Sequence, residues 1–200
     1  MQHQMTSRLA LACLTAFVPV VLAAQEGSLD LTFNPSDLGN GAGDDANSTV
    51  SALEVQPDGR ILMVGSFTEY DGVARWGIVR VNADGTVDGG FDPGTGASGI
   101  LCLARQGDGK ILIAGSFQSF NGTTKRQIAR LNTDGSLDSG FDSGNGTDQA
   151  IRTIAVQSDG KILIGGQFTN YNGTPCNRLA RLLSNGTLDP TFTPGSGPNN

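Results

Sequence analysis

The residues best suited to chemistry in this chain are its aspartates, because carboxylates bind hard cations and act as acid–base groups. Asp44 and Asp45 lie in a glycine-rich insertion, around residues 39–48, that follows no repeated pattern, and Asp37 lies just before it. Glycine permits a tight loop, and a loop of this kind could bind calcium. These three aspartates are therefore the candidate metal ligands, although a solvated acidic loop is the favoured interpretation.

Other aspartates recur with a fixed arginine partner. A hairpin centred on the turn at Asp84 places Arg80 opposite Asp88, with Val81 opposite Val87. The same arrangement recurs twice, in Arg130 with Asp138 and in Arg181 with Asp189. We interpret these pairs as structural. If exposed, each would contribute at most about 1 kcal/mol, whereas breaking a pair buried between repeats could cost several kcal/mol.

Catalytic chemistry has few other residues to draw on. His3 is the single histidine and lies in a segment expected to be removed, so a Ser-His-Asp arrangement is excluded from the mature chain. Zinc sites need more histidines or cysteines than remain. Paired carboxylates across neighbouring repeats are the enzymatic alternative. Convergence of Asp148 with Asp37, Asp44 and Asp45 would favour that alternative.

The N-terminal residues 1–24 are predicted to be a secretory signal peptide. Arg8 supplies a positive charge before an apolar run at 9–22, and small residues follow that run. The run is short for a membrane span, and no second apolar run of membrane length follows. We therefore expect a secreted or cell-surface protein that does not cross the membrane.

Composition limits the partners and cross-links of the mature chain. A net charge of −6 argues against nucleic acid, because an acidic surface repels phosphates. Cys102 and Cys176 fall at different positions of the repeat, whereas a disulfide framework would recur with it. They are interpreted as incidental cysteines, with a single disulfide between them as the alternative.

The elements that position these residues come from an internal repeat. A phrase of the form Gln-x-Asp-Gly-Lys/Arg-Ile-Leu begins at Gln56, Gln106 and Gln157. Self-similarity of this kind indicates a repeat architecture. The predicted divisions are an N-terminal strand at 25–33, repeats at 34–92, 93–142 and 143–193, and the start of a linker at 194–200.

Each repeat is expected to form four short strands. In the first repeat, turn signals separate short apolar runs, and the turn at Pro57, Asp58 and Gly59 has the residues of a bulged hairpin. This pattern predicts an all-β fold. Phenylalanines and tyrosines that recur with the repeat are expected to pack in the core. The four expected strands of the first repeat are 49–56, 60–67, 76–82 and 86–91.

The combination Q-x-D-G-K-I-L-x-x-G-x-F, then N-G, then A-R-L-N-x-D-G-S-L-D-x-x-F resembles the delta-60 repeat, a bacterial β-propeller repeat. The resemblance covers roughly residues 28–200. It implies propeller blades of about four antiparallel strands in an exported, often large, surface protein. It brings no established catalytic residues. The spacing of 50 and 51 residues between Asp58, Asp108 and Asp159 is short for that family.

Three blades do not close a propeller, which typically has about four to eight. We therefore expect an incomplete ring and further blades in the same chain, with self-association as the alternative. The predicted function is an exported non-enzymatic module for extracellular binding or structure, which presents propeller loops to a protein or a glycan. The alternative is a propeller-type lyase or glycoside hydrolase with a calcium or carboxylate centre.

Overall fold

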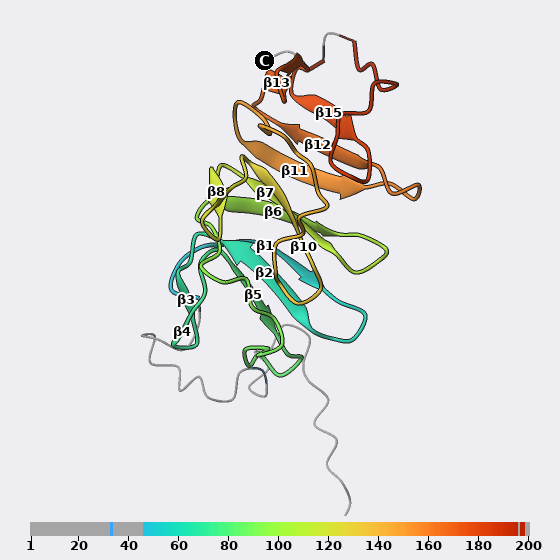
Figure 1. Cartoon of the computed structure of the whole chain (residues 1–200). Coiled ribbons are helices and arrows are strands. Elements are labelled where there is room, and N and C mark those ends of the chain that lie inside the picture. The colour runs from blue at the N-terminus through green and yellow to red at the C-terminus, as the bar shows by residue number, and fades with distance from the viewer. Residues whose placement is uncertain (1–32, 34–45, 196, 199–200) are drawn as a thin grey trace, which may run out of the picture. The chain divides into compact units, whose positions relative to one another are not determined.

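The computed structural model describes Phe33, residues 46–195 and residues 197–198 (Figure 1). Within those residues the chain consists of β-strands, turns and bends, without helices. The all-β fold predicted from the sequence is thereby confirmed. Asp37, Asp44 and Asp45, and the predicted signal peptide, lie outside the described residues.

Each repeat forms one unit, here called a blade, made of a three-stranded antiparallel sheet and a separate two-stranded hairpin. In the first blade, β1 (Val50–Val55), β2 (Ile61–Gly65) and β5 (Ile78–Val81) pair in the order β1-β2-β5. The hairpin is formed by β3 (Glu69–Tyr70) and β4 (Val73–Ala74).

The other two blades repeat this arrangement with the same strand order. The second blade contains β6 (Ile100–Arg105), β7 (Ile111–Gly115), β8 (Ser119–Phe120), β9 (Thr123–Thr124) and β10 (Ile128–Leu131). The third blade contains β11 (Ile151–Val156), β12 (Ile162–Gly166), β13 (Asn170–Tyr171), β14 (Thr174–Pro175) and β15 (Leu179–Leu182).

The turn between β1 and β2 shows why the Asp-Gly phrase recurs. The Gly59 N–H donates to the Gln56 carbonyl at 2.9 Å, and the Gln56 N–H donates to the Arg60 carbonyl at 2.7 Å. Gly59 has φ +84°, a conformation that side chains rarely allow. The Asp58 carboxylate accepts a hydrogen bond from the Arg60 N–H and closes the turn. The bulged hairpin predicted from these residues is therefore confirmed.

The segment expected as a fourth strand, residues 86–91, is not a strand. It makes one β-bridge, between Val81 and Val87, and the predicted register is confirmed by that bridge. Asp88 then bends the chain, because its Oδ1 accepts a hydrogen bond from the Gly90 N–H at 2.8 Å. The main sheet of a blade consequently has three strands instead of four.

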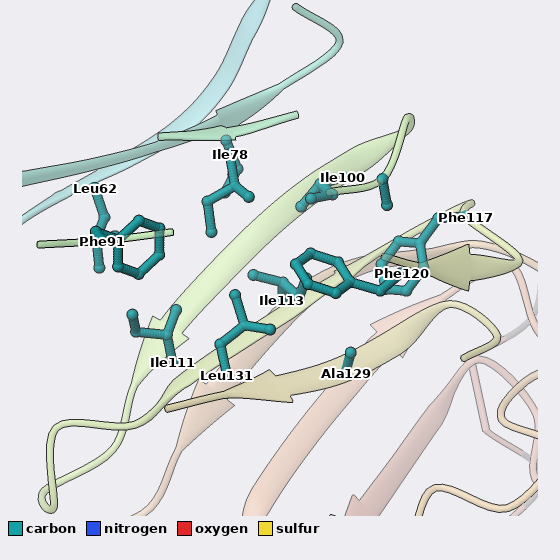
Figure 2. Close-up of a cluster of buried hydrophobic side chains, with 12 residues drawn as sticks. Leu62, Ile78, Phe91, Ile100, Ile111, Ile113, Phe117, Phe120, Ala129 and Leu131 are labelled. Carbon is teal, nitrogen blue, oxygen red and sulfur yellow. The ribbon is translucent and has the colours of Figure 1, made fainter. Parts of the chain in front are cut away.

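The core lies between the sheets of successive blades. Figure 2 shows Leu62 and Ile78 of the first blade facing Ile111 and Leu131 of the second blade, with Phe91 among them. All five side chains are fully buried. A second cluster of the same kind joins the second and third blades. Each sheet therefore has two apolar faces, a front face toward the preceding blade and a back face toward the following blade.

Candidate functional site

The arginine–aspartate pair of the first blade lies at the junction with the second blade. Arg80 Nε donates to Asp88 Oδ2 at 2.7 Å, and the arginine side chain is 7% exposed. Arg80 Nη1 donates to the carbonyl of Thr133 in the second blade, also at 2.7 Å. The guanidinium carbon lies 4.8 Å from the centroid of the Phe91 ring. We call the set of Arg80, Asp88 and Phe91 a docking triad.

The second junction repeats these contacts. Arg130 Nε donates to Asp138 Oδ2 at 2.7 Å, and Arg130 lies 4.9 Å from the centroid of the Phe141 ring. Arg130 Nη1 donates to the carbonyl of Ser184 in the third blade. A backbone bond accompanies the triad at each junction, from the Asp92 N–H to the Asp134 carbonyl and from the Asp142 N–H to the Asn185 carbonyl.

The third triad is assembled but only partly covered. Arg181 Nε lies 2.8 Å from Asp189 Oδ2, and the guanidinium carbon lies 4.7 Å from the Phe192 ring centroid. The Arg181 side chain is 20% exposed, against 10% for Arg130. Leu179 and Phe192 are half-buried, although their counterparts in the other blades are fully buried. A hollow of about 840 Å³ lies over this back face.

A second cation reaches the aspartate of each triad. Arg60 Nη1 lies 2.8 Å from Asp88, and Lys110 Nζ lies 2.8 Å from Asp138. Burial raises the pKa of Asp88, but hydrogen bonds from Arg60, Gly90 and Arg80 outweigh burial and lower the pKa to about 2. The same balance lowers the pKa of Asp138 to about 2. In the sequence these cations are the Lys or Arg after each Asp-Gly, but the sequence alone does not show that they reach the aspartates.

A shallow groove opens at the junction of the first and second blades. Trp76, the only tryptophan in the chain, is 50% exposed at its edge. The groove has a volume of about 470 Å³, and its lining includes Ser98, Ser116, Gln118 and Ser119. An exposed indole face beside hydroxyl and amide groups offers both apolar contact and hydrogen bonds. In the sequence, Trp76 is distinguished only by falling outside the register of the recurring phenylalanines and tyrosines.

The backbone beside Trp76 is repeated in the other blades, but the side chain is not. Gly96 packs against the Trp76 carbonyl so closely that a Cβ there would lie 2.0 Å from the oxygen, and Gly146 does the same at Arg126. Asn177 is the third counterpart and is approached by Gly197. The scaffold is therefore constant, while the side chain displayed at this position changes from blade to blade.

A comparison with protein-family models matches three segments of this chain, residues 56–91, 106–141 and 157–192, to a family described as a domain of unknown function (DUF5122) beta-propeller. The chain belongs to this family. Each match begins at the glutamine before the first turn and ends at the phenylalanine of the docking triad, so a DUF5122 match contains all three triad residues. Searches of curated proteins and of solved structures gave no match.

Asp148, the remaining carboxylate proposed for an enzymatic site, holds a loop of the third DUF5122 blade. Its Oδ1 accepts hydrogen bonds from the Thr169 N–H at 2.8 Å and the Asn170 N–H at 3.1 Å. Its Oδ2 accepts one from the Thr169 hydroxyl at 2.6 Å. Asn47 makes the corresponding bond to the Thr68 N–H in the first blade. Both carboxylate oxygens of Asp148 are therefore engaged with the loop before β13.

The calcium prediction falls outside the described part of the chain, where Asp37, Asp44 and Asp45 lie. Among residues 46–195, Phe33 and residues 197–198, no three acidic, cysteine or histidine side chains form a cluster suited to a metal ion. Those same residues include no helix that could span a bilayer. The calcium site of the DUF5122 chain stays a prediction.

The two cysteines of the described blades are free thiols, so no disulfide joins Cys102 to Cys176 in the structure. Both pack beside the core between the second and third blades. Burial raises the pKa of Cys102 to about 11. Burial also raises the pKa of Cys176, with a smaller contribution from Asp148. Both residues serve as small apolar side chains in this arrangement.

Proposed function

We propose that this chain is an exported, non-enzymatic β-propeller module of the delta-60 repeat type that binds an extracellular glycan in the groove beside Trp76. The observation that carries the proposal is the combination of a half-exposed indole with hydroxyl and amide side chains in one groove. A signal-peptide pattern at residues 1–24 supports export to a compartment where glycans are displayed.

The groove has the chemistry that a sugar ring requires. One face of a sugar ring carries C–H groups, which pack against an aromatic face, and its hydroxyls need hydrogen-bond partners. Trp76 can supply the aromatic face, and Ser116 and Gln118 can supply the hydrogen-bond partners. Gly99 keeps this space open, because a Cβ at its φ of +83° would lie 2.6 Å from Ser116 Oγ. The groove is shallow, which suits a short segment of an extended glycan better than a small molecule that a binding site must enclose.

The non-enzymatic part of the proposal is supported by how the carboxylates of the described blades are used. Asp88 and Asp138 each contact two cations at a junction, and their pKa values are lowered to about 2. A carboxylate with so low a pKa is a poor general acid near neutral pH. Both carboxylate oxygens of Asp148 accept hydrogen bonds from the loop before β13. These aspartates therefore stabilise the blades.

The single tryptophan allows a direct test, because all intrinsic indole fluorescence comes from the groove. Neutral and acidic oligosaccharides selected on a glycan array would be titrated into the full chain. We expect a saturable shift of the emission maximum, and we expect Trp76→Ala to lose array binding. Arg126→Ala is the matched control, because Arg126 occupies the same backbone position in the second blade.

Failure of every array glycan to bind, or equal binding by the Trp76→Ala chain, would contradict the glycan proposal. Retention of a protein from an extracellular extract by the wild-type chain but not by Trp76→Ala would instead point to a protein ligand at the same groove.

A further inference from the structure

The back face of the third blade matches a surface that is covered in both other blades. In the first two blades the docking triad and the leucine beside it contact the next blade. In the third blade Leu163, Leu179 and Phe192 are half-buried, although the residues at the same positions in the first two blades are fully buried, and the hollow beside Arg181 is open. Because the triad is already assembled, this face is shaped to receive the front face of another blade.

A complementary surface is present on the same chain, on the front of the first blade. Val50, Leu53 and Val55 of β1 are 38%, 61% and 62% exposed. The counterparts of Val50 and Leu53 in the third blade, Ile151 and Ile154, are buried against the second blade. Exposed apolar side chains gathered on one strand commonly mark an interaction site.

The two surfaces also match in charge at the first strands of the blades. At the first junction Glu54 on a back face pairs with Arg105 on a front face at 3.2 Å. At the second junction these positions are the apolar residues Ala104 and Val156, which both pack beside the core. The open back face presents Ala155 and the open front face presents Val55, so their meeting would resemble the second junction and bury no unpaired charge.

The triad has a matching acceptor as well. Arg80 and Arg130 donate to the carbonyls of Thr133 and Ser184, which hold the same position in the turn of the next blade. The first blade carries Ala83 at that position, in an exposed turn. Arg181 therefore has the geometry to donate to the Ala83 carbonyl of another chain.

We propose that the back face of the third blade binds the front face of the first blade in a second copy of this chain, so that two copies close a ring of six blades. A head-to-tail interface of this kind either closes into a ring or grows into a filament. Six blades lie within the range of about four to eight that propellers adopt. The second copy is the chosen partner because one chain supplies both halves of a junction that it already uses twice.

The test measures the mass of the full chain by light scattering after size exclusion, over a range of protein concentrations. We expect the mass of a dimer for the wild type. Leu53→Glu and Ala155→Glu each place a charge on one open face, and each should raise the dimer dissociation constant at least tenfold. Both positions are exposed in the single chain, so the variants should keep its far-UV circular dichroism. Arg126→Ala is the control, because it removes an exposed side chain of the second blade that belongs to neither open face.

A cysteine pair tests the register of the contact. Val55→Cys combined with Ala155→Cys should give a reducible covalent dimer on oxidation. Glu54→Cys combined with Arg105→Cys is the matched control, since those side chains meet within one chain, and it should give a cross-linked monomer.

A monomer at every concentration would overturn the proposal, and so would a dimer that Leu53→Glu and Ala155→Glu leave intact. Oligomers that keep growing beyond the dimer would overturn ring closure. None of these outcomes depends on glycan binding, so this proposal and the proposed function can fail separately.

Discussion

The buried junction at Arg130 and the open face at Arg181 contain the same triad in different surroundings. Both arginines contact their own aspartate and lie over their own phenylalanine at nearly equal distances. Arg130 also donates to Ser184 in the next blade, whereas Arg181 Nη2 donates to Thr191 in its own blade at 3.3 Å. A blade therefore assembles its triad alone, and the neighbouring blade adds burial and one further hydrogen bond.

The largest effect that separates the two triads should come from removing each arginine. Arg130→Ala leaves Asp138 buried with one cation fewer, and it should lower the free energy of unfolding by about 3–5 kcal/mol. Arg181→Ala removes a more exposed arginine, 20% against 10%, which donates within its own blade, but it also leaves the buried Asp189 with one cation fewer. It should therefore cost less than Arg130→Ala, about 1–3 kcal/mol. Urea unfolding at low protein concentration would measure both.

Equal losses for the two variants would contradict the view that the neighbouring blade determines the contribution of the triad. A loss for Arg181→Ala that grows with protein concentration would show that a second chain covers the open face.

Acid should weaken the buried junctions in a defined pH window. The pKa of Asp88 and of Asp138 is about 2 in the folded chain, against an ordinary value of 3.8, so the unfolded chain binds more protons between these values. The contribution of these groups is fully present above about pH 4 and is lost as the pH falls toward 2. Urea unfolding at a series of pH values would show this decline, and Asp138→Asn should make it shallower. An unchanged slope in Asp138→Asn would refute the assignment to this carboxylate.

A smaller effect distinguishes the third blade from the second. Tyr171 Oη donates to the Gly186 carbonyl at 2.6 Å in a buried position, whereas the second blade has Phe120 at the equivalent site. Tyr171→Phe should therefore lower the free energy of unfolding by about 1 kcal/mol without changing the fold. Thermal unfolding would measure the loss, with Tyr70→Phe as the counterpart in the first blade. If Tyr171→Phe were as stable as the wild type, this hydrogen bond would contribute nothing measurable to stability, and phenylalanine in the second blade would carry no stability cost.

Local features of the fold were predictable from the sequence because they depend on residues only a few positions apart. The Asp-Gly turns fixed which residues face each other, so the bridge between Val81 and Val87 followed from the position of Asp84. The fourth strand was predicted wrongly for an equally local reason. Asp88 was assigned one role, as the partner of Arg80, but its other oxygen caps Gly90 and bends the chain.

Features that depend on distant residues were not predictable. The carbonyl that accepts from Arg80 belongs to Thr133, 53 residues away, and no periodicity identifies it. The small hairpin strands contain two residues each, too few to show alternation. In the groove, Trp76 was conspicuous because it breaks the aromatic repeat. Ser116 and Gln118 hold ordinary positions in the repeat, and only the folded chain brings them beside the indole.

The ion pair between Glu54 and Arg105 bears on how such an array can be rearranged. The docking triads are alike, so they would accept the blades in any order. This ion pair occurs at the first junction, and the second junction has Ala104 and Val156 in its place. If the first two blades were exchanged, Glu54 would meet Val156 and its charge would lose its partner. The order of the first two blades therefore depends on one charged pair, and a rearrangement that separates these two blades would break the pair while leaving the three triads unchanged.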